Sequence, residues 1–336
     1  MIHPIPPGTR DVLPDEMREL RALSGSLHAT FDRAGFGEVW TPALEYEEVL
    51  RRGDERAAGA GFRLFDDRGH VLALRSDPTI PIARLVANRY AGEPGPLRLC
   101  YFAHAYRAVE RGSGQAREFL QGGIELIGVG GAEGDAEVIA LIVEALSEAG
   151  LRRHRIGLGD GMLYRAMLAD AAVSEEDAQP LLEAVGVEAE QRERILAELV
   201  TGDFVGVERE LETLQLDDAQ RELLLRVPRM RGGPDILQSI TGALEQAGTG
   251  MRDVLELLAP SVAERIIFDF GLVRSLGYYT GAVFQVYDPA HGVPIGSGGR
   301  YDELLGKFGR SLPAVGFALN VERLHIALTG EERGLA

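Results

Sequence analysis

The 336-residue sequence has a single cysteine, Cys100, and no apolar run long enough to cross a lipid bilayer. One cysteine excludes a disulfide framework, and its position inside an apolar run predicts a buried structural thiol in a reducing compartment. The N-terminus lacks a basic segment followed by an apolar stretch, so it does not resemble a secretory signal. We therefore expect a cytoplasmic protein with no membrane contact.

Several catalytic signatures are also missing. The seven histidines are scattered, and with only one cysteine no metal-ligand spacing is present. There is no P-loop, and residues 157–161 lack the full dinucleotide fingerprint. Nothing resembles the nucleophile elbow of serine hydrolases. From these absences we expect neither a bound metal nor a cofactor.

Basic residues are scarce relative to acidic ones: 35 Lys and Arg stand against 52 Asp and Glu, a net charge of −17. Between residues 174 and 220 there are 14 acidic and only three basic residues, a net charge of −11. The simplest interpretation is a solvated helical face. In any case this stretch has the wrong sign for binding along an RNA backbone.

Two helices are predicted from apolar periodicity. The first follows Pro14 and ends at Gly35, with Met17, Leu20, Leu23, Leu27 and Phe31 on one face. The second begins with Asp135 as its cap and ends at Gly150, with Val138, Leu141, Ile142, Ala145 and Leu146 on its apolar face. Residues 37–44 read as a strand, and Pro42 within it indicates a sheet edge or an interface.

The middle of the chain differs from both flanks in its residue composition and its predicted secondary structure. Residues 166–255 are rich in helical patterns with short polar breaks, whereas glycine- and aromatic-rich strands lie on either side. We therefore expect an α+β core with an antiparallel sheet, formed by residues 1–165 and 256–336. Residues 166–255 are predicted to be a helix-rich acidic insertion into it.

The strand predicted over residues 119–127 carries a polar face. Alternation places Gln121, Gly123 and Glu125 on the same side, with the glycine leaving an open floor between two polar groups. Such a face could hold a ligand the size of an amino acid, polar at both ends. From spacing alone, an edge strand with its polar face in water is an equally good interpretation.

A second strand is predicted over residues 278–284, with Tyr279 and Gly281 on one face. Arg274 lies just upstream, where a guanidinium could bind a carboxylate or phosphate, although a surface arginine is the commoner explanation. Residues 298–302, Gly-Gly-Arg-Tyr-Asp, could form a turn around an anion, but this motif is weak evidence alone.

Taken together, these segments resemble the class II aminoacyl-tRNA synthetase core of histidyl-tRNA synthetase across nearly the whole chain. The resemblance covers the opening (residues 6–11), motif 1, which builds the family's dimer interface (35–42), motif 2 (106–125), the histidine-specific motif (272–281) and motif 3 (298–324). The last two are the most specific. The sequence ends thirteen residues after Arg323, so we expect the family's anticodon-binding domain to be missing.

The resemblance implies functional residues at matching positions. Those that would contact histidine are Asp77, Thr79, Gln121, Glu125, Tyr279 and Tyr301. Those that would face a nucleotide and its phosphates, as a vestigial site, are Arg107, Arg274 and Arg323.

The departures from the family pattern fall on the reactive side. Val109 stands where motif 2 has an acid, and Gln115 where it has a second arginine. Ser275 and Gly277 replace a glycine and an aspartate of the histidine-specific motif, and Asn320 replaces a glycine of motif 3. Because adenylation needs cations aimed at the α-phosphate, these changes predict a retained amino-acid pocket without activating chemistry.

This pattern is similar to the synthetase paralogues that serve as regulatory subunits of ATP phosphoribosyltransferase. The similarity implies no catalytic residues, a short-form catalytic subunit as partner, free histidine as effector, a homodimer or larger assembly, and no tRNA binding. A divergent histidyl-tRNA synthetase and an orphan ATP-dependent amino-acid ligase remain as alternatives, the latter because the three arginines survive.

Overall fold

The computed structural model of the protein describes residues 5–55, 61–108, 115–164, 167, 194–199, 202–214, 216–240, 245–272 and 277–334. Of the positions singled out above, Val109, Arg274 and Ser275 lie outside the described residues. So do residues 174–193, 200, 201 and 215 of the acidic stretch.

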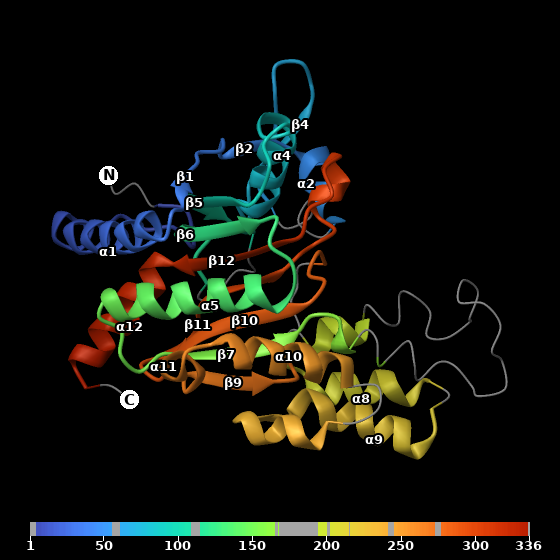
Figure 1. The fold of residues 1–336 in the computed structure, drawn as a ribbon. Helices are drawn as coiled ribbons and strands as arrows, with labels where there is room; N and C mark the ends of the chain where they lie inside the picture. Colours follow the sequence, from blue (N-terminus) through green and yellow to red (C-terminus); the bar gives the residue numbers. More distant parts are fainter. Residues whose placement is uncertain are drawn as a thin grey trace.

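A nine-stranded sheet runs through the molecule in the order β1-β5-β6-β12-β11-β10-β7-β9-β8 (Figure 1). Its strands are β1 (Gly37–Glu38), β5 (Leu97–Tyr106), β6 (Glu118–Ile127), β7 (Arg155–Asp160), β8 (Arg231–Gly232), β9 (Ile266–Asp269), β10 (Ala282–Asp288), β11 (His291–Arg300) and β12 (Ala314–Asn320). Neighbouring strands are antiparallel except in the pairs β1–β5 and β7–β9, which are parallel. The predicted α+β class with a mainly antiparallel sheet is confirmed.

The strand predicted over residues 37–44 is divided between two sheets. β1 covers only two residues and forms the edge of the large sheet, as Pro42 indicated. After Pro42 the chain enters β2 (Leu44–Tyr46), which pairs with β4 (Val71–Leu74) in a three-stranded sheet completed by β3 (Arg63–Phe65).

Helices α1 (Pro14–Arg33), α5 (Gly131–Glu148) and α12 (Val321–Glu332) lie along one face of the large sheet (Figure 1). The apolar stripes of α1 and α5 are buried against the sheet residues Ile124 and Leu126 of β6. Both predicted helices are confirmed, and Gly35 and Gly150 follow them with positive φ, a conformation that glycine adopts without steric cost. The predicted cap is wrong: the cap of α5 is Gly130, and Asp135 lies inside the helix.

The opposite face of the sheet is covered by α2 (Glu47–Gly53), α4 (Thr79–Arg89) and the short helix η4 (Leu305–Phe308). A second core forms there around the buried rings of Tyr101, Tyr278 and Tyr301. The polar side chains of the candidate site lie beside these tyrosines, so this face carries the site.

The described elements that begin within residues 166–255 include α8 (Phe204–Glu212), α9 (Asp218–Arg226), η1 (Val227–Arg229), β8, η2 (Pro234–Ser239) and α10 (Glu245–Leu257), and residues 194–199 are also helical. Helices α8 and α9 lie at the end of the sheet beyond β9 (Figure 1). β8 pairs with β9, and α10 packs against α5 and β7. A short α11 (Pro260–Ala263) then leads into β9.

Cys100 is fully buried in β5, and burial raises the pKa of its thiol to about 12, so it is a structural thiol as predicted. None of the described helices is long and apolar enough to cross a membrane.

Arg300 has a structural role: the sequence allowed a turn around an anion at residues 298–302, and the structure has the end of a strand there. Gly298, Gly299 and Arg300 belong to β11, and the buried guanidinium of Arg300 pairs with Asp135 of α5 at 2.8 Å. It also donates to the carbonyl oxygens of Val129 and Gly131, at 3.2 and 2.7 Å. Arg300 thus connects the first turns of α5 to the sheet through an ion pair and two hydrogen bonds.

We predict that Arg300→Met destabilises the protein by about 3–5 kcal/mol, because it leaves the Asp135 carboxylate buried without its partner. The measurement is urea unfolding followed by circular dichroism. Arg209→Met is the control, since Arg209 is exposed and lies 3.9 Å from Glu198, and a change below about 0.5 kcal/mol is expected there. Equal midpoints for the two variants would contradict the role of Arg300.

Candidate functional site

A small pocket on the α4 side of the sheet brings together most of the residues predicted from the sequence. Its lining includes Asp77, Thr79, Gln121, Tyr279 and Tyr301, together with Arg107. Asp77 lies two residues before α4, Thr79 is the first residue of that helix, Gln121 belongs to β6, and Tyr301 directly follows β11. Segments more than two hundred residues apart in the sequence therefore meet here.

Glu125 lies directly behind this lining. It is fully buried on β6 and accepts hydrogen bonds from the hydroxyl groups of Thr79, at 2.8 Å, and Tyr301. Burial, partly offset by these two hydrogen bonds, raises the pKa of the Glu125 carboxyl group to about 8. Glu125 therefore fixes the two lining residues and is protonated near neutral pH.

Gln121 presents a free acceptor to the pocket. Its side chain is buried, and its Oε1 atom has no hydrogen-bond partner among the described residues. A buried acceptor without a partner costs about 1–3 kcal/mol, so a ligand that donates a hydrogen bond here would be favoured. Asp77 and Arg107 place opposite charges in the same lining, which suits a ligand carrying both an ammonium and a carboxylate group.

The predicted open floor at Gly123 is filled. Tyr101 lies opposite Gly123 on β5, and a Cβ atom at Gly123 would lie 2.4 Å from the Tyr101 ring. The glycine therefore makes room for this ring and not for a ligand. In this conformation the free volume of the pocket is about 20 Å³, enough for roughly one water molecule.

The segment before β10 also differs from its prediction. β10 begins at Ala282, so Tyr278 and Tyr279 precede the strand and do not alternate along it. Their rings contact each other at 4.8 Å between centroids. A Cβ atom at Gly299 would lie 2.8 Å from the Tyr279 ring. The absence of a side chain at Gly299 therefore allows the Tyr279 ring to pack against β11.

Two of the three arginines expected to face a nucleotide lie on the described part of the chain. Arg107 lines the pocket and stacks over the Phe119 ring at 5.0 Å. The guanidinium of Arg323 donates to the carbonyl oxygen of Pro294 at 2.9 Å. Burial and the neighbouring charge of Arg107 lower the pKa of Arg323, so the two cations lie close together.

The structure gives a role to Asn320, which departs from the synthetase pattern. Its side chain accepts from the backbone N–H of Arg323 at 2.8 Å and forms the cap of α12. The glycine expected at this position in motif 3 would leave that space open. Here the backbone N–H that an anion could bind is already occupied.

Sequence reasoning missed Tyr101, Ser297 and Phe317, which also line the pocket. Tyr101 could have been found only from the pairing of β5 with β6, because it faces Gly123 across the strands. Its own sequence neighbourhood is an apolar run without a polar signal.

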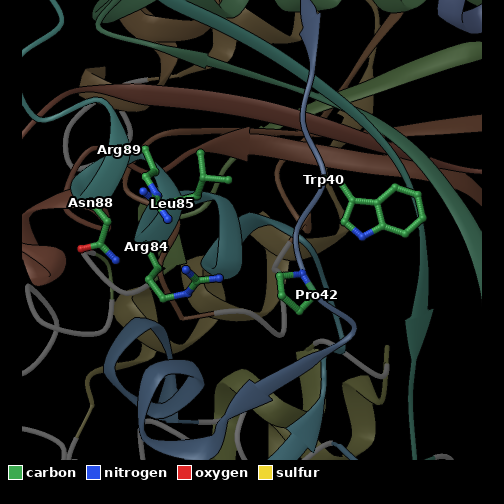
Figure 2. Close-up of a pocket in the computed structure, with 6 residues that line it drawn as sticks. All are labelled: Trp40, Pro42, Arg84, Leu85, Asn88 and Arg89. Atoms are coloured by element: carbon green, nitrogen blue, oxygen red, sulfur yellow. The ribbon is translucent and has the colours of Figure 1, made fainter.

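A second cavity of about 590 Å³ opens on the surface beside the N-terminal segment. Figure 2 shows Trp40 and Pro42, from the segment between β1 and β2, across from the α4 residues Arg84, Leu85, Asn88 and Arg89. We call this the Trp40 groove. Trp40 is 82% exposed, which is unusual for the largest apolar side chain. Among all the residues that the structure describes, including those of the groove, no cluster of acidic, histidine or cysteine side chains could hold a metal ion.

The elevated pKa of Glu125 predicts a pH dependence of stability. Burial raises the pKa of folded Glu125 to about 8, whereas an unfolded glutamate loses its proton near its ordinary pKa of 4.5, so stability falls as the pH rises through this window. We expect Glu125→Gln, which mimics the protonated acid, to remove at least about 1.4 kcal/mol of this loss, one pKa unit's worth. The measurement is urea unfolding at several pH values between 5 and 8. Parallel profiles for the two proteins would contradict the assignment.

The family model for histidyl-tRNA synthetase matches this chain over residues 8–185 and 178–324. A protein of Symbiobacterium thermophilum, named ATP phosphoribosyltransferase regulatory subunit, is 41% identical across 96% of this chain and 79% of its own length. A Desulforamulus reducens protein of the same name is 38% identical across 96% of this chain and 78% of its own length.

The fold is similar to a solved structure described as an ATP phosphoribosyltransferase regulatory subunit/histidyl-tRNA synthetase from Bacillus halodurans C. The TM-score is 0.84 at 33% identity, covering 97% of this chain and 84% of that one. This similarity confirms the class II synthetase-like core. The chain therefore belongs to the family of ATP phosphoribosyltransferase regulatory subunits, non-catalytic relatives of histidyl-tRNA synthetase.

Proposed function

We propose that this chain binds free histidine and, as the regulatory subunit of a cytoplasmic ATP phosphoribosyltransferase, uses it for feedback control of histidine biosynthesis. The observation that carries the ligand assignment is the buried Oε1 atom of Gln121, which has no hydrogen-bond partner among the described residues and lies in a pocket lined by both Asp77 and Arg107. An amino acid carries the matching groups: N–H donors, an ammonium and a carboxylate. The family relationship supports histidine among amino acids.

The surroundings of the pocket favour binding without reaction. A guanidinium that stabilises an adenylating transition state must point at the reacting phosphate. Arg323 donates to the Pro294 carbonyl, and Asn320 occupies the backbone of the first turn of α12. These contacts support a regulatory subunit over a synthetase or ligase, so neither ATP-dependent activation nor tRNA charging is expected of this chain.

Homodimerisation through the Trp40 groove is the second part of the proposal. An exposed tryptophan beside a groove is self-complementary in a twofold arrangement, where each copy places its ring against the other. Trp40 and Pro42 also belong to the segment that resembles motif 1. The third part is the catalytic partner, a short-form phosphoribosyltransferase subunit, which follows from the names of the relatives.

We predict that the purified chain binds free histidine and that Gln121→Ala weakens binding by about 1–3 kcal/mol, roughly 5- to 150-fold, because a ligand donor loses its buried acceptor. Isothermal titration calorimetry measures the affinity. Gln238→Ala, at an exposed position in η2, is the control and should bind histidine as the wild type does. No binding by the wild type would refute the ligand assignment.

We further predict that this chain forms a complex with the short-form catalytic subunit, and that histidine lowers ATP-phosphoribosyl transfer by the mixture about 5- to 150-fold. Gel filtration detects the complex, and the transfer assay is run with and without histidine.

Gln121→Ala should assemble normally but need more histidine for the same inhibition. If the catalytic subunit neither co-elutes with the wild-type chain nor responds to it, the regulatory assignment is wrong. Aminoacylation of tRNA by the chain with ATP and histidine would instead support the synthetase.

A further inference from the structure

We propose that α4 and Arg75 couple the ligand pocket to the Trp40 groove, so that histidine binding and self-association change each other's affinity. This inference rests on the proposed function and adds a connection between its two sites. It assigns to Arg75 the role of a positioning residue.

Helix α4 reaches both sites. It begins at Thr79, which lines the pocket and donates to Glu125, and it ends at Arg89, which lines the groove. At 1.5 Å per residue the two ends are about 15 Å apart. Ile80, Ile82 and Val86 are buried in the second core, so the helix is held along its length. A displacement of its first turn is therefore transmitted to Arg84, Leu85 and Arg89.

The Arg75 side chain makes a parallel connection. Its guanidinium is buried and donates to the carbonyl oxygens of Thr41, at 2.6 Å, Pro42, at 3.1 Å, and His104, at 2.9 Å. Among the described residues its recorded hydrogen-bond acceptors are uncharged. A buried arginine normally pairs with an acid, because desolvating a charge is costly. Here the hydrogen bonds to Thr41, Pro42 and His104 offset part of that cost, and they hold the segment carrying Trp40 against the end of β5.

The Arg75 backbone extends this connection to the pocket. Its N–H donates to Ala43 at 2.9 Å, and its carbonyl oxygen accepts from the N–H of Tyr106 at 3.0 Å, one residue before Arg107. Two residues after Arg75 lies Asp77, whose carboxylate accepts from the backbone N–H of Thr79. Arg75 thus joins the Trp40 segment to both charged residues of the pocket lining.

Because the pocket has so little free volume, ligand binding has to move residues that are connected to the Trp40 groove. A free volume of about 20 Å³ cannot hold an amino acid, so binding must move part of the wall. Asp77, Thr79 and Arg107 belong to that wall, and each is tied to the Trp40 groove through α4 or Arg75. Because coupling between two sites is reciprocal, the dimer must bind histidine with an affinity different from that of the monomer.

The first experiment measures the dimer dissociation constant by analytical ultracentrifugation, with and without saturating L-histidine. We expect a shift of at least about 5-fold, within the usual range of allosteric coupling. L-alanine replaces histidine as the ligand control and should give no shift.

The second experiment compares histidine affinities by calorimetry. Trp40→Ala, which is designed to disrupt the dimer, should change the affinity of each site by the square root of the factor by which histidine changes the dimer dissociation constant, because the dimer binds two histidine molecules. Phe65→Ala is the matched control, because Phe65 is 75% exposed and lies outside the groove lining. It should leave both constants unchanged.

The third experiment isolates Arg75. Arg75→Lys keeps the charge but cannot make the same fork of hydrogen bonds, so the factor by which histidine changes dimerisation should fall below about 2-fold, whatever the two separate constants become. If that variant is unfolded by circular dichroism, the comparison of Trp40→Ala with Phe65→Ala decides the question alone.

The outcomes separate the two proposals. A wild-type chain that binds no histidine overturns the proposed function. A chain that binds histidine and dimerises, but whose two constants are independent of each other, overturns the coupling and leaves the proposed function standing.

Discussion

The buried carboxyl group of Glu125 is the point on which the site depends. It joins three parts of the chain distant in sequence, because Thr79 at the start of α4 and Tyr301 directly after β11 both donate to it on β6. This requires a glycine on the neighbouring strand: a Cβ atom at Gly316 would lie 1.7 Å from Glu125 Oε2. Burial keeps the carboxyl group protonated near neutral pH, so the centre of the site holds no unpaired negative charge.

Much of the fold could be predicted from local patterns. The stripe of α1, the face of α5 and the edge position of β1 follow from periodicity and from Pro42. The predictions that failed depended on contacts distant in sequence. Aspartate is a residue type that often caps helices, but Asp135 pairs with Arg300, which lies 165 residues later in the sequence. This partner can be identified only from the three-dimensional structure. Side-chain chemistry alone could not distinguish these two roles.

The candidate site shows the same division. Alternation along β6 correctly placed Gln121 and Glu125 on one face, because the side-chain period of a strand is fixed. Its interpretation of Gly123 was wrong, since a glycine makes space without showing what fills it. The register of β5 against β6 shows that Tyr101 lies opposite Gly123, and its ring fills the space. Several of the predicted residues therefore line a common pocket, whose free volume in this conformation is only about 20 Å³.

A closed pocket in a non-catalytic protein has a physical consequence. Ligand binding must supply the free energy that opens the wall, so the apparent affinity is reduced by the fraction of molecules already open. An enzyme could recover this cost by excluding water from its reaction. Here Arg323 and Asn320 are committed to protein contacts, so under the proposed function the movement itself has to be the output. The residues that move must then also contact a second surface, and the run from Thr79 to Arg89 along α4 meets that requirement in a single helix.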